Sequence, residues 1–329
     1  MTTFKALRIY EIDRKIVARI DSLQLSDLNP GGVVIKVLYS SINYKDALAA
    51  TGAGRILRRF PLVGGIDLAG VVQTSDDARY HPGDHVLVTG CGLSETHDGG
   101  FAEYARVNAD WVVPLPDSLG AFKAMAIGTA GFTAAMAIQK MERNGQSPAR
   151  GPVAVTGASG GVGSLAIDML STRGYEVVAI TGKASSEEYL KSIGAHRVLF
   201  RDQISFGTKP LESAQFAGAV DNLGGNMLAW LTRITSDGGN IASIGLAAGH
   251  ELSTTVMPFI LRGVNLLGIN AAAQKPSERQ AIWSLLASDL MPRNLLRIAH
   301  KTIAFDELLS EFPEYMAGAV VGRSVVKIA

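Results

Sequence analysis

The residues with the clearest chemical use form a glycine-rich run between a short apolar stretch and an apolar segment of helical period. The run is Thr156-Gly157-Ala158-Ser159-Gly160-Gly161-Val162-Gly163. Glycines let the backbone approach a phosphate closely, and a helix that begins there offers free N–H groups and a positive dipole end. A ligand-free tight turn is the alternative, but the strand–turn–helix context favours a dinucleotide site. We expect Ser159, Gly160, Gly161 and Val162 to contact it.

The residues after the next strand favour a phosphorylated cofactor. In NAD sites a carboxylate about 20 residues after the glycine turn binds the ribose 2′-OH. Here the strand expected over 176–181 ends at Thr181 and is followed by Gly182, Lys183 and two serines. A cation with hydroxyl donors suits a 2′-phosphate, which a carboxylate would repel. The sequence therefore predicts NADPH, with a solvated lysine at a helix start as the alternative interpretation of Lys183.

Other chemistries have few candidate residues. The histidines are His81, His85, His97, His196, His250 and His300. They are scattered along the chain, and Cys91, the single cysteine, has no recognisable catalytic partner and is interpreted as a turn residue. No nucleophile elbow or P-loop sequence is present. We therefore expect hydride transfer without a metal.

The composition fits a globular enzyme with small-molecule ligands. The 329 residues are 47% hydrophobic and 19% charged, with a net charge of +1, which gives no general attraction to nucleic acid or anionic membranes. One cysteine fits a reducing compartment. We find no signal-peptide pattern and no apolar run of about 20 residues, and interpret 124–138 as a buried helix. We expect a cytoplasmic protein that binds neither nucleic acid nor membrane.

The first third of the chain reads as short strands separated by turns. The turn signals include Asn29-Pro30-Gly31-Gly32 and His81-Pro82-Gly83-Asp84. This pattern predicts a compact, β-rich, barrel-like domain, followed by a helix over 119–141. The expected strands cover 4–10, 16–20, 33–41, 68–73, 85–89 and 101–107.

From Gly151 onward strands and helices alternate, which predicts a doubly wound parallel sheet with helices on both faces. The expected strands cover 153–156, 176–181, 197–200, 218–222, 239–244 and 263–270, and the expected helices 164–173, 185–193, 225–234 and 278–290. A last strand over 323–328 has no obvious place in this sheet. If it returns to the first domain, that domain is discontinuous.

Several motifs carry a resemblance to a known family over nearly the whole chain. The motifs are Ser40–Leu48 (SSINYKDAL), Gly65–Gly70 (GIDLAG), Gly128–Ala134 (GTAGFTA), Val155–Gly163 (VTGASGGVG), Glu188–Ala195 (EYLKSIGA) and Thr254–Arg262 (TTVMPFILR). Together they resemble the acrylyl-CoA reductase group of the zinc-free, quinone-oxidoreductase-like medium-chain dehydrogenase/reductases. Zinc-dependent relatives place metal ligands at positions matching Asn43, Ile66-Asp67 and Thr129, and they carry a four-cysteine lobe that this sequence lacks.

The resemblance implies an α/β protein of two domains. A GroES-like catalytic domain would comprise 1–122 and 264–329, and a Rossmann NADPH-binding domain 123–263. It also implies a homodimer and NADPH-dependent reduction of the C=C bond of acryloyl-CoA to propanoyl-CoA. The thioester carbonyl would draw electrons from the alkene, so that the β-carbon accepts hydride, the enolate oxygen needs stabilising donors and the α-carbon takes a proton.

The same resemblance indicates the site residues. Tyr44 either donates that proton or packs against the nicotinamide while water donates it, and Asn43 would orient substrate or ribose. Asp46 and Asp67 are expected to brace turns. Further expected cofactor contacts are Tyr44, Thr133, Arg201, Ile260 and Arg323, together with Leu246 and Asn270, which follow strand ends where a doubly wound sheet holds ligands. The basic residues Arg55, Arg58 and Arg59 would meet the phosphates of a CoA substrate, or form a solvated loop.

The sequence is also compatible with two other functions. An NADPH-dependent quinone or enone reductase would need no cations for CoA phosphates. A non-catalytic NADPH-binding protein with a regulatory or structural role would share the dinucleotide site and lack turnover.

Overall fold

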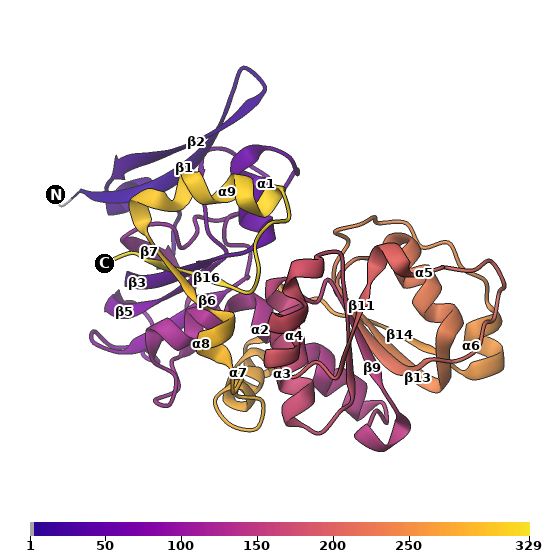
Figure 1. Ribbon diagram of the computed structural model, residues 1–329. Coiled ribbons are helices and arrows are strands. Elements are labelled where there is room, and N and C mark those ends of the chain that lie inside the picture. Colours follow the sequence, from indigo (N-terminus) through magenta and orange to yellow (C-terminus); the bar gives the residue numbers. More distant parts are fainter. Residues whose placement is uncertain (1–2) are drawn as a thin grey trace. The chain divides into compact units, whose positions relative to one another are not determined.

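The computed structural model describes residues 3–329, in two compact units (Figure 1). The first unit comprises the chain up to Thr129, Ala272–Ala287 and Ala299–Ala329, and the second comprises Ala130–Ala271 and Ser288–Ile298. These limits differ from the predicted 122/123 and 263/264 because of specific contacts. Thr129 bonds to Asp67 of the first unit, and Asn294 bonds to Asp168 of the second.

The first unit contains two sheets. The smaller has the order β2-β1-β4, formed by β1 (Phe4–Ile12), β2 (Lys15–Leu23) and β4 (Leu62–Val63). The larger has the order β15-β16-β3-β5-β6-β8, with β7 also paired to β3. Its strands are β3 (Val33–Ile42), β5 (Asp67–Ser75), β6 (His85–Thr89), β7 (Tyr104–Val107), β8 (Val113–Pro114), β15 (Lys301–Ala304) and β16 (Ser324–Lys327). Because β16 pairs antiparallel with β3, the last predicted strand does return to this unit.

Helices α1 (Tyr44–Thr51), α7 (Pro276–Leu286) and α9 (Leu308–Met316) belong to the first unit. Figure 1 shows α9, in yellow, beside α1, and the two helices are in contact. Helix α7 corresponds to the helix predicted over 278–290, whereas α1 was not predicted. Short 3-10 helices cover Leu25–Asp27, Ala109–Trp111, Pro148–Arg150, Ala184–Ser186, Arg201–Gln203 and Phe305–Glu307.

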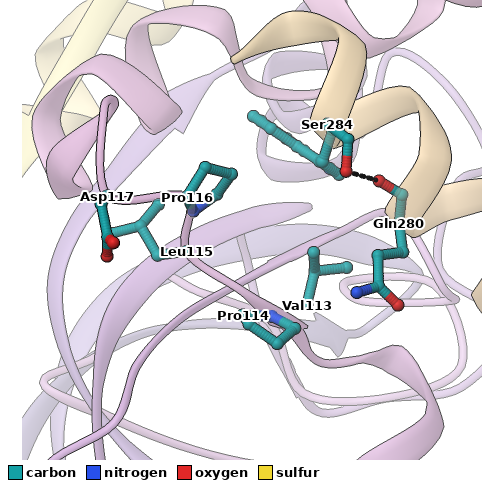
Figure 2. A pocket seen from close by; sticks show the side chains of 8 residues that line it. Val113, Pro114, Leu115, Pro116, Asp117, Gln280 and Ser284 are labelled. Carbon is teal, nitrogen blue, oxygen red and sulfur yellow. Dashed lines mark hydrogen bonds between the residues drawn. The ribbon is translucent and has the colours of Figure 1, made fainter. Parts of the chain in front are cut away.

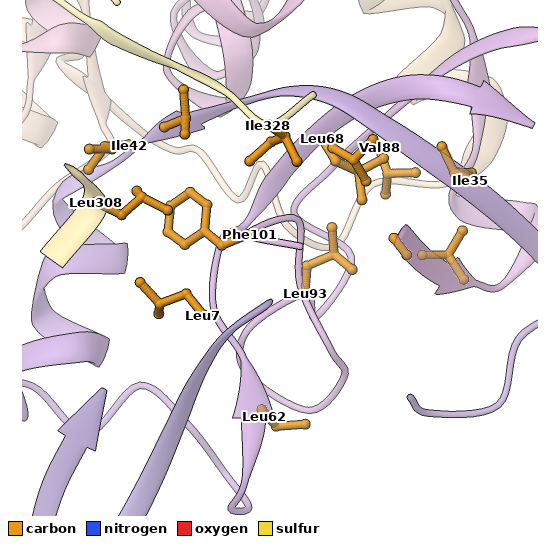
Figure 3. Close-up of a cluster of buried hydrophobic side chains, with 14 of the residues drawn as sticks. Leu7, Ile35, Ile42, Leu62, Leu68, Val88, Leu93, Phe101, Leu308 and Ile328 are labelled. Atoms are coloured by element: carbon orange, nitrogen blue, oxygen red, sulfur yellow. The ribbon is translucent and has the colours of Figure 1, made fainter. Parts of the chain in front are cut away.

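One hydrophobic core joins distant parts of the chain in this unit (Figure 3). Phe101 lies among Leu7, Leu68 and Leu308, all of them buried, and its ring centroid is 6.3 Å from that of Phe312. Burial of apolar surface contributes about 25 cal/mol per Å². The C-terminal segments are therefore part of the core that supports β3, β5 and α1.

The second unit is a parallel sheet with the order β11-β10-β9-β12-β13-β14. Its strands are β9 (Val153–Thr156), β10 (Val177–Thr181), β11 (Arg197–Phe200), β12 (Phe216–Asp221), β13 (Thr235–Ser243) and β14 (Asn265–Gly268). Its helices are α3 (Gly161–Thr172), α4 (Glu187–Ser192), α5 (Gly225–Ile234), α6 (Met257–Arg262) and α8 (Leu295–Ile298), with α3 and α5 on opposite sides of the sheet in Figure 1. In chain order this is 3-2-1-4-5-6, so the predicted doubly wound Rossmann sheet is confirmed.

Helix α2 (Gly120–Arg143) corresponds to the helix predicted over 119–141, and it is interrupted where Gly128 has φ 51° and ψ −160°. By length and composition it could cross a membrane, contrary to our expectation that no segment reaches that length. Of its most apolar window, 72% is buried, as in the core helix of a folded domain.

Candidate active site

The parallel sheet of the second unit has its topological switch point between β9 and β12, where the direction of strand order reverses. Both strands end in polar residues that bond to each other. Thr156 Oγ1 donates to Asp221 Oδ1 at 2.6 Å, and Asn222 Nδ2 donates to the Thr156 carbonyl at 2.7 Å. Burial raises the pKa of Asp221. Open α/β sheets bind ligands outside the carboxyl ends of their strands at this point.

The glycine-rich turn leaves β9 at the switch point and begins α3. Gly157 has φ 57°, a left-handed conformation that favours glycine. The helical ladder starts where Ser164 N donates to the Gly160 carbonyl at 2.9 Å, so the N–H groups of 161–163 have no acceptor within the helix. A Cβ on Gly163 would lie 2.4 Å from the Gly157 carbonyl oxygen, so only glycine allows this close packing. The turn therefore presents backbone donors suited to a pyrophosphate.

Buried hydroxyl groups connect this turn to the end of β10. Thr181 Oγ1 accepts a hydrogen bond from Lys183 N at 3.1 Å and lies 3.4 Å from the hydroxyls of Ser159 and Ser186. Ser186 Oγ donates to the Lys183 carbonyl at 2.7 Å. Ser186 was not predicted as a site residue, although its place in the hydroxyl-rich turn after Lys183 was the available signal. The cluster fixes the loop that carries Lys183.

Two cations stand at the ends of β10 and β11. Lys183 is half-buried, and desolvation lowers its pKa. Arg201 is exposed and follows β11, with its guanidinium beside Gly182, where an added Cβ would be 3.4 Å from Nη2. A phosphate near them would be bound by charge-assisted hydrogen bonds.

The other predicted cofactor contacts of this unit lie in different settings. Leu246 and Asn270 are exposed and follow β13 and β14, so they share the carboxyl edge with the glycine turn. Thr133 is buried on α2. Ile260 is 71% exposed on α6, a helix that packs on β13, and so is not itself at a strand end.

In the first unit a buried carboxylate, Asp67, gathers the polar residues that the sequence indicated. Its side chain is fully buried and accepts from Ser41 Oγ at 2.7 Å, from Asn43 Nδ2 at 2.8 Å and from Thr129 Oγ1 at 2.5 Å. Gly128 permits this approach, because a Cβ there would lie 2.7 Å from Asp67 Oδ2. The bracing role predicted for Asp67 agrees with these bonds, and the part of Ser41 was missed.

A second carboxylate, Asp46, lies at N3 of α1. Its Oδ2 accepts from Asn43 N at 2.8 Å and its Oδ1 accepts from Ile66 N at 3.0 Å, which closes the start of the helix. Burial, with the nearby charge of Asp67, raises the pKa of Asp46 to about 7. Asn43 and Asp46 together form a capping box.

Arg323 was expected to contact the cofactor, but the structure gives its guanidinium other partners. The side chain is 3% exposed, and its five N–H donors meet five acceptors within the first unit. The acceptors are the carbonyls of Met125, Ala126 and Ile42, Asn43 Oδ1 and Ser41 Oγ, at 2.7–3.4 Å. A saturated, buried guanidinium has no donor left for a ligand.

The amide of Asn43 is occupied as well. Its Oδ1 accepts from Arg323 and its Nδ2 donates to Asp67 and to Asp46, the latter at 3.3 Å. The Asn43 amide therefore has no free N–H for the expected contact with substrate or ribose. Tyr44, the next residue, begins α1 and is 45% exposed, unlike the buried residues of the Asp67 cluster.

The basic loop after α1 carries Arg55, Arg58 and Arg59, all exposed. Within residues 3–329, none of the three forms an ion pair with a carboxylate. By contrast, nearby Lys45 is paired with Glu95. The three arginines thus retain donors for an anionic ligand.

The positions that match metal ligands of zinc-dependent relatives form a hydrogen-bonded cluster here, in which Asp67 bonds to Asn43 and Thr129. In the described part of the chain, no three His, Cys, Asp or Glu residues form a group that could hold a metal ion.

A shallow cavity of about 290 Å³ lies elsewhere in the first unit (Figure 2). It is formed by the segment 113–117 and by residues of α7. Ser284 Oγ there donates to the Gln280 carbonyl at 3.0 Å. The lining mixes apolar side chains, two prolines among them, with the polar side chains of Asp117, Gln280 and Ser284, and it includes none of the predicted site residues.

Two family models match the chain. The alcohol dehydrogenase GroES-like domain covers residues 29–117, and the zinc-binding dehydrogenase model covers 161–288. Among curated proteins, the chain is 46% identical to the probable acrylyl-CoA reductase AcuI of Escherichia coli (98% of this chain, 99% of that protein). It is 45% identical to the acrylyl-CoA reductase AcuI of Ruegeria pomeroyi (95% of each). It is also 44% identical to YhfP of Bacillus subtilis, named as a candidate quinone oxidoreductase (99% of each).

Solved structures of similar proteins superpose closely. E. coli YhdH with bound NADPH has a TM-score of 0.95 at 46% identity, covering 98% of this chain and all of that one. Bacillus subtilis YhfP with NAD bound has a TM-score of 0.97 at 44% identity, with full coverage of both chains.

Proposed function

The chain belongs to the acrylyl-CoA reductase group of the zinc-free, quinone-oxidoreductase-like medium-chain dehydrogenase/reductases, and on this premise we propose that it reduces the C=C bond of acryloyl-CoA to give propanoyl-CoA, using NADPH. The observation that carries the proposal is the site at the switch point, where buried hydroxyls adjoin the glycine turn and accept a hydrogen bond from the backbone N–H of Lys183. The AcuI relatives, similar over nearly the whole chain, supply the substrate class.

The second unit supplies the cofactor site in this proposal. The N–H groups at 161–163 bind the pyrophosphate, and Ser159 and Thr181 line the adenosine end. Lys183 and Arg201 neutralise the 2′-phosphate, which favours NADPH over NADH. We keep Thr133, Leu246, Ile260 and Asn270 as proposed contacts of the nicotinamide half. Bound NADPH supplies a hydride to the β-carbon of the enoyl thioester.

In this proposal the first unit supplies the proton donor and the residues that bind the CoA part of the substrate. The Tyr44 hydroxyl delivers a proton to the α-carbon and regains one from water, so the reaction adds one hydride and one proton across the double bond. Asn43, whose amide is held by Arg323 and Asp67, positions the residue that follows it rather than touching the substrate. Arg55, Arg58 and Arg59 bind the phosphates of CoA.

Reduction of a quinone or enone is the second candidate, because one close relative, YhfP, bears that name. Such a substrate has no phosphate groups, so the arginine loop would have no part in its binding. A protein that binds NADPH without turnover is the third possibility, and the same assay distinguishes it.

We also propose a cytoplasmic homodimer. Val256, just before α6, is 66% exposed and Leu261, on α6, is 60% exposed, and β14 is the edge strand of its sheet in the described part of the chain. An apolar patch beside an unpaired edge favours association with a second copy. A single cysteine suits a reducing compartment.

The test is NADPH oxidation by the purified protein with acryloyl-CoA, crotonyl-CoA and a benzoquinone, with propanoyl-CoA identified by mass spectrometry. We expect acryloyl-CoA to give the highest kcat/KM. A higher kcat/KM for the quinone would replace the proposal by the second candidate, and slow turnover of all three would favour the binding protein.

A further inference from the structure

The buried guanidinium of Arg323 in the first unit forms hydrogen bonds with the junction between β3 and α1. Arg323 Nη1 donates to both the Ile42 carbonyl and Asn43 Oδ1 at 3.0 Å. These acceptors directly precede Tyr44, the first residue of α1. A residue 279 positions later in the chain, just before β16, therefore holds the backbone and the side chain on which the helix start depends.

Charge determines how the Asn43 amide lies. The guanidinium bonds the oxygen, whereas the carboxylates of Asp67 and Asp46 accept from the nitrogen at 2.8 and 3.3 Å. A flipped amide would place oxygen against two carboxylates and nitrogen against a cation. The cluster therefore allows one orientation only, which aligns the capping box that starts α1.

A buried charged cluster of this kind is not expected to add much to the stability of the fold. Burying charges is energetically costly, and well-packed apolar residues of similar volume often stabilise a fold equally well. Arg323 Nη2 is 3.8 Å from Asp67 Oδ2, and both side chains are almost fully buried. Buried charge networks of this kind are better suited to fixing geometry than to adding stability.

We propose that Arg323 is a positioning residue of the reductase, which acts through Asn43 and Ile42 to set the orientation of Tyr44. The inference rests on the proposed function in naming Tyr44 as the proton donor. It assigns Arg323 to the catalytic step and not to cofactor binding. Misplacement of a catalytic group by about 1 Å can cost about 100-fold in rate.

The central variant is Arg323→Lys, which keeps the charge but replaces the planar five-donor fork by an ammonium that cannot reach five acceptors. We expect kcat to fall about 10- to 100-fold while KM for NADPH changes less than twofold. The matched control is Arg106→Lys, in the same unit, where Arg106 Nε donates only to the Gly31 carbonyl at 3.0 Å. We expect its kcat to equal that of the wild type.

A double-mutant cycle separates positioning from general damage. In a Tyr44→Phe background, Arg323→Lys should change kcat less than twofold, because the hydroxyl that it positions is already gone. The same fold decrease in both backgrounds, or an unchanged kcat for Arg323→Lys, would overturn the inference. If Arg323→Lys does not fold, Asn43→Ala removes the link with the guanidinium in place, and is expected to give the same coupling to Tyr44→Phe.

A crystal structure of Arg323→Lys gives a readout independent of activity. We expect the Asn43 amide to be rotated and the Tyr44 hydroxyl to be displaced. Unmoved positions of both would overturn the inference even if the wild type reduced none of the tested substrates, an outcome that would contradict only the proposed function.

Discussion

Thr156 Oγ1 donates a 2.6 Å hydrogen bond to Asp221 Oδ1 across the switch point of the parallel sheet, and both residues are fully buried. The same hydroxyl accepts from Asn222 N at 2.9 Å. The glycine turn begins at the next residue after Thr156. This hydroxyl thus links the two strands between which a dinucleotide would be bound.

Thr156→Val is expected to destabilise the protein by about 1–3 kcal/mol, because it leaves a buried carboxylate and a backbone N–H each short of a partner. Denaturant unfolding measures this change. We expect the dissociation constant for NADPH, followed by fluorescence titration, to rise as well. Thr156→Ser keeps the hydroxyl and should behave as the wild type in both measurements. An unaltered Thr156→Val protein would show that the bond contributes nothing.

Lys183→Ala is expected to lower kcat/KM for NADPH about 10- to 100-fold and to leave the value for NADH nearly unchanged, because only NADPH carries the 2′-phosphate. Steady-state assays with both cofactors test this. Lys191→Ala is the control, since Lys191 is exposed on α4 and paired with Glu187 at 2.7 Å. Equal use of both cofactors by the wild type would contradict the preference for NADPH.

Replacing Arg55, Arg58 and Arg59 together by alanine should raise KM for acryloyl-CoA about 10- to 100-fold, because a phosphate loses its charged donors. Acryloyl-pantetheine lacks the nucleotide phosphates of CoA, so its kinetic constants should not change. The comparison requires only the two thioesters and the triple variant. Equal effects on both substrates would assign the loop a structural role instead.

Tyr44→Phe should lower kcat by about 100-fold or more if the hydroxyl is the proton donor, and should leave it unchanged if the ring only packs. We expect the decrease, because the proposed mechanism takes the proton for the α-carbon from this hydroxyl. A primary isotope effect with deuterated NADPH shows whether the chemical step limits the rate. Unchanged turnover under that condition would exclude the acid role.

Asp46→Asn is expected to change how stability depends on pH. Burial raises the pKa of Asp46 from 3.8 to about 7, so between these values the folded protein retains a proton that the unfolded chain has lost. Wild-type stability from this group is therefore greatest below about pH 4 and is lost as the pH rises to about 7. The asparagine of the variant does not titrate. The free energy of unfolding of the variant should therefore rise relative to that of the wild type between about pH 4 and about pH 7. Urea unfolding at several pH values measures the difference.

The sequence was sufficient to predict those elements whose signals lie close together along the chain. The glycine turn, β9 and α3 were predicted together because a buried strand, a turn and an apolar helix follow within 20 residues. Helix α1 was missed, although Asn43 and Asp46 form a capping box three residues apart. Its short length and its position directly after β3 give little periodicity to detect.

The cluster around Asp67 could not be derived in this way. Ser41, Thr129 and Arg323 come to it from different elements, and the bond between Arg323 and Ser41 spans 282 positions. Sequence reasoning expected Arg323, in a Gly-Arg pair, to reach the cofactor. Its burial depends on β16 pairing with β3, which is a tertiary relationship. Likewise, 288–298 belongs to the second unit because Asn294 bonds to Asp168.

Strand β16 lies between β15 and β3, so an interior position of the larger sheet is filled by a segment that is synthesised long after β3. Until residues 323–327 have been synthesised, residues 39–42 of β3 lack the pairing with β16. The Ile42 carbonyl and Asn43 Oδ1 also lack their hydrogen bonds from Arg323. The parallel sheet of the other unit needs nothing beyond Ser288–Ile298 and can assemble earlier. During synthesis, the nucleotide-binding half would therefore be complete before the half that carries Tyr44.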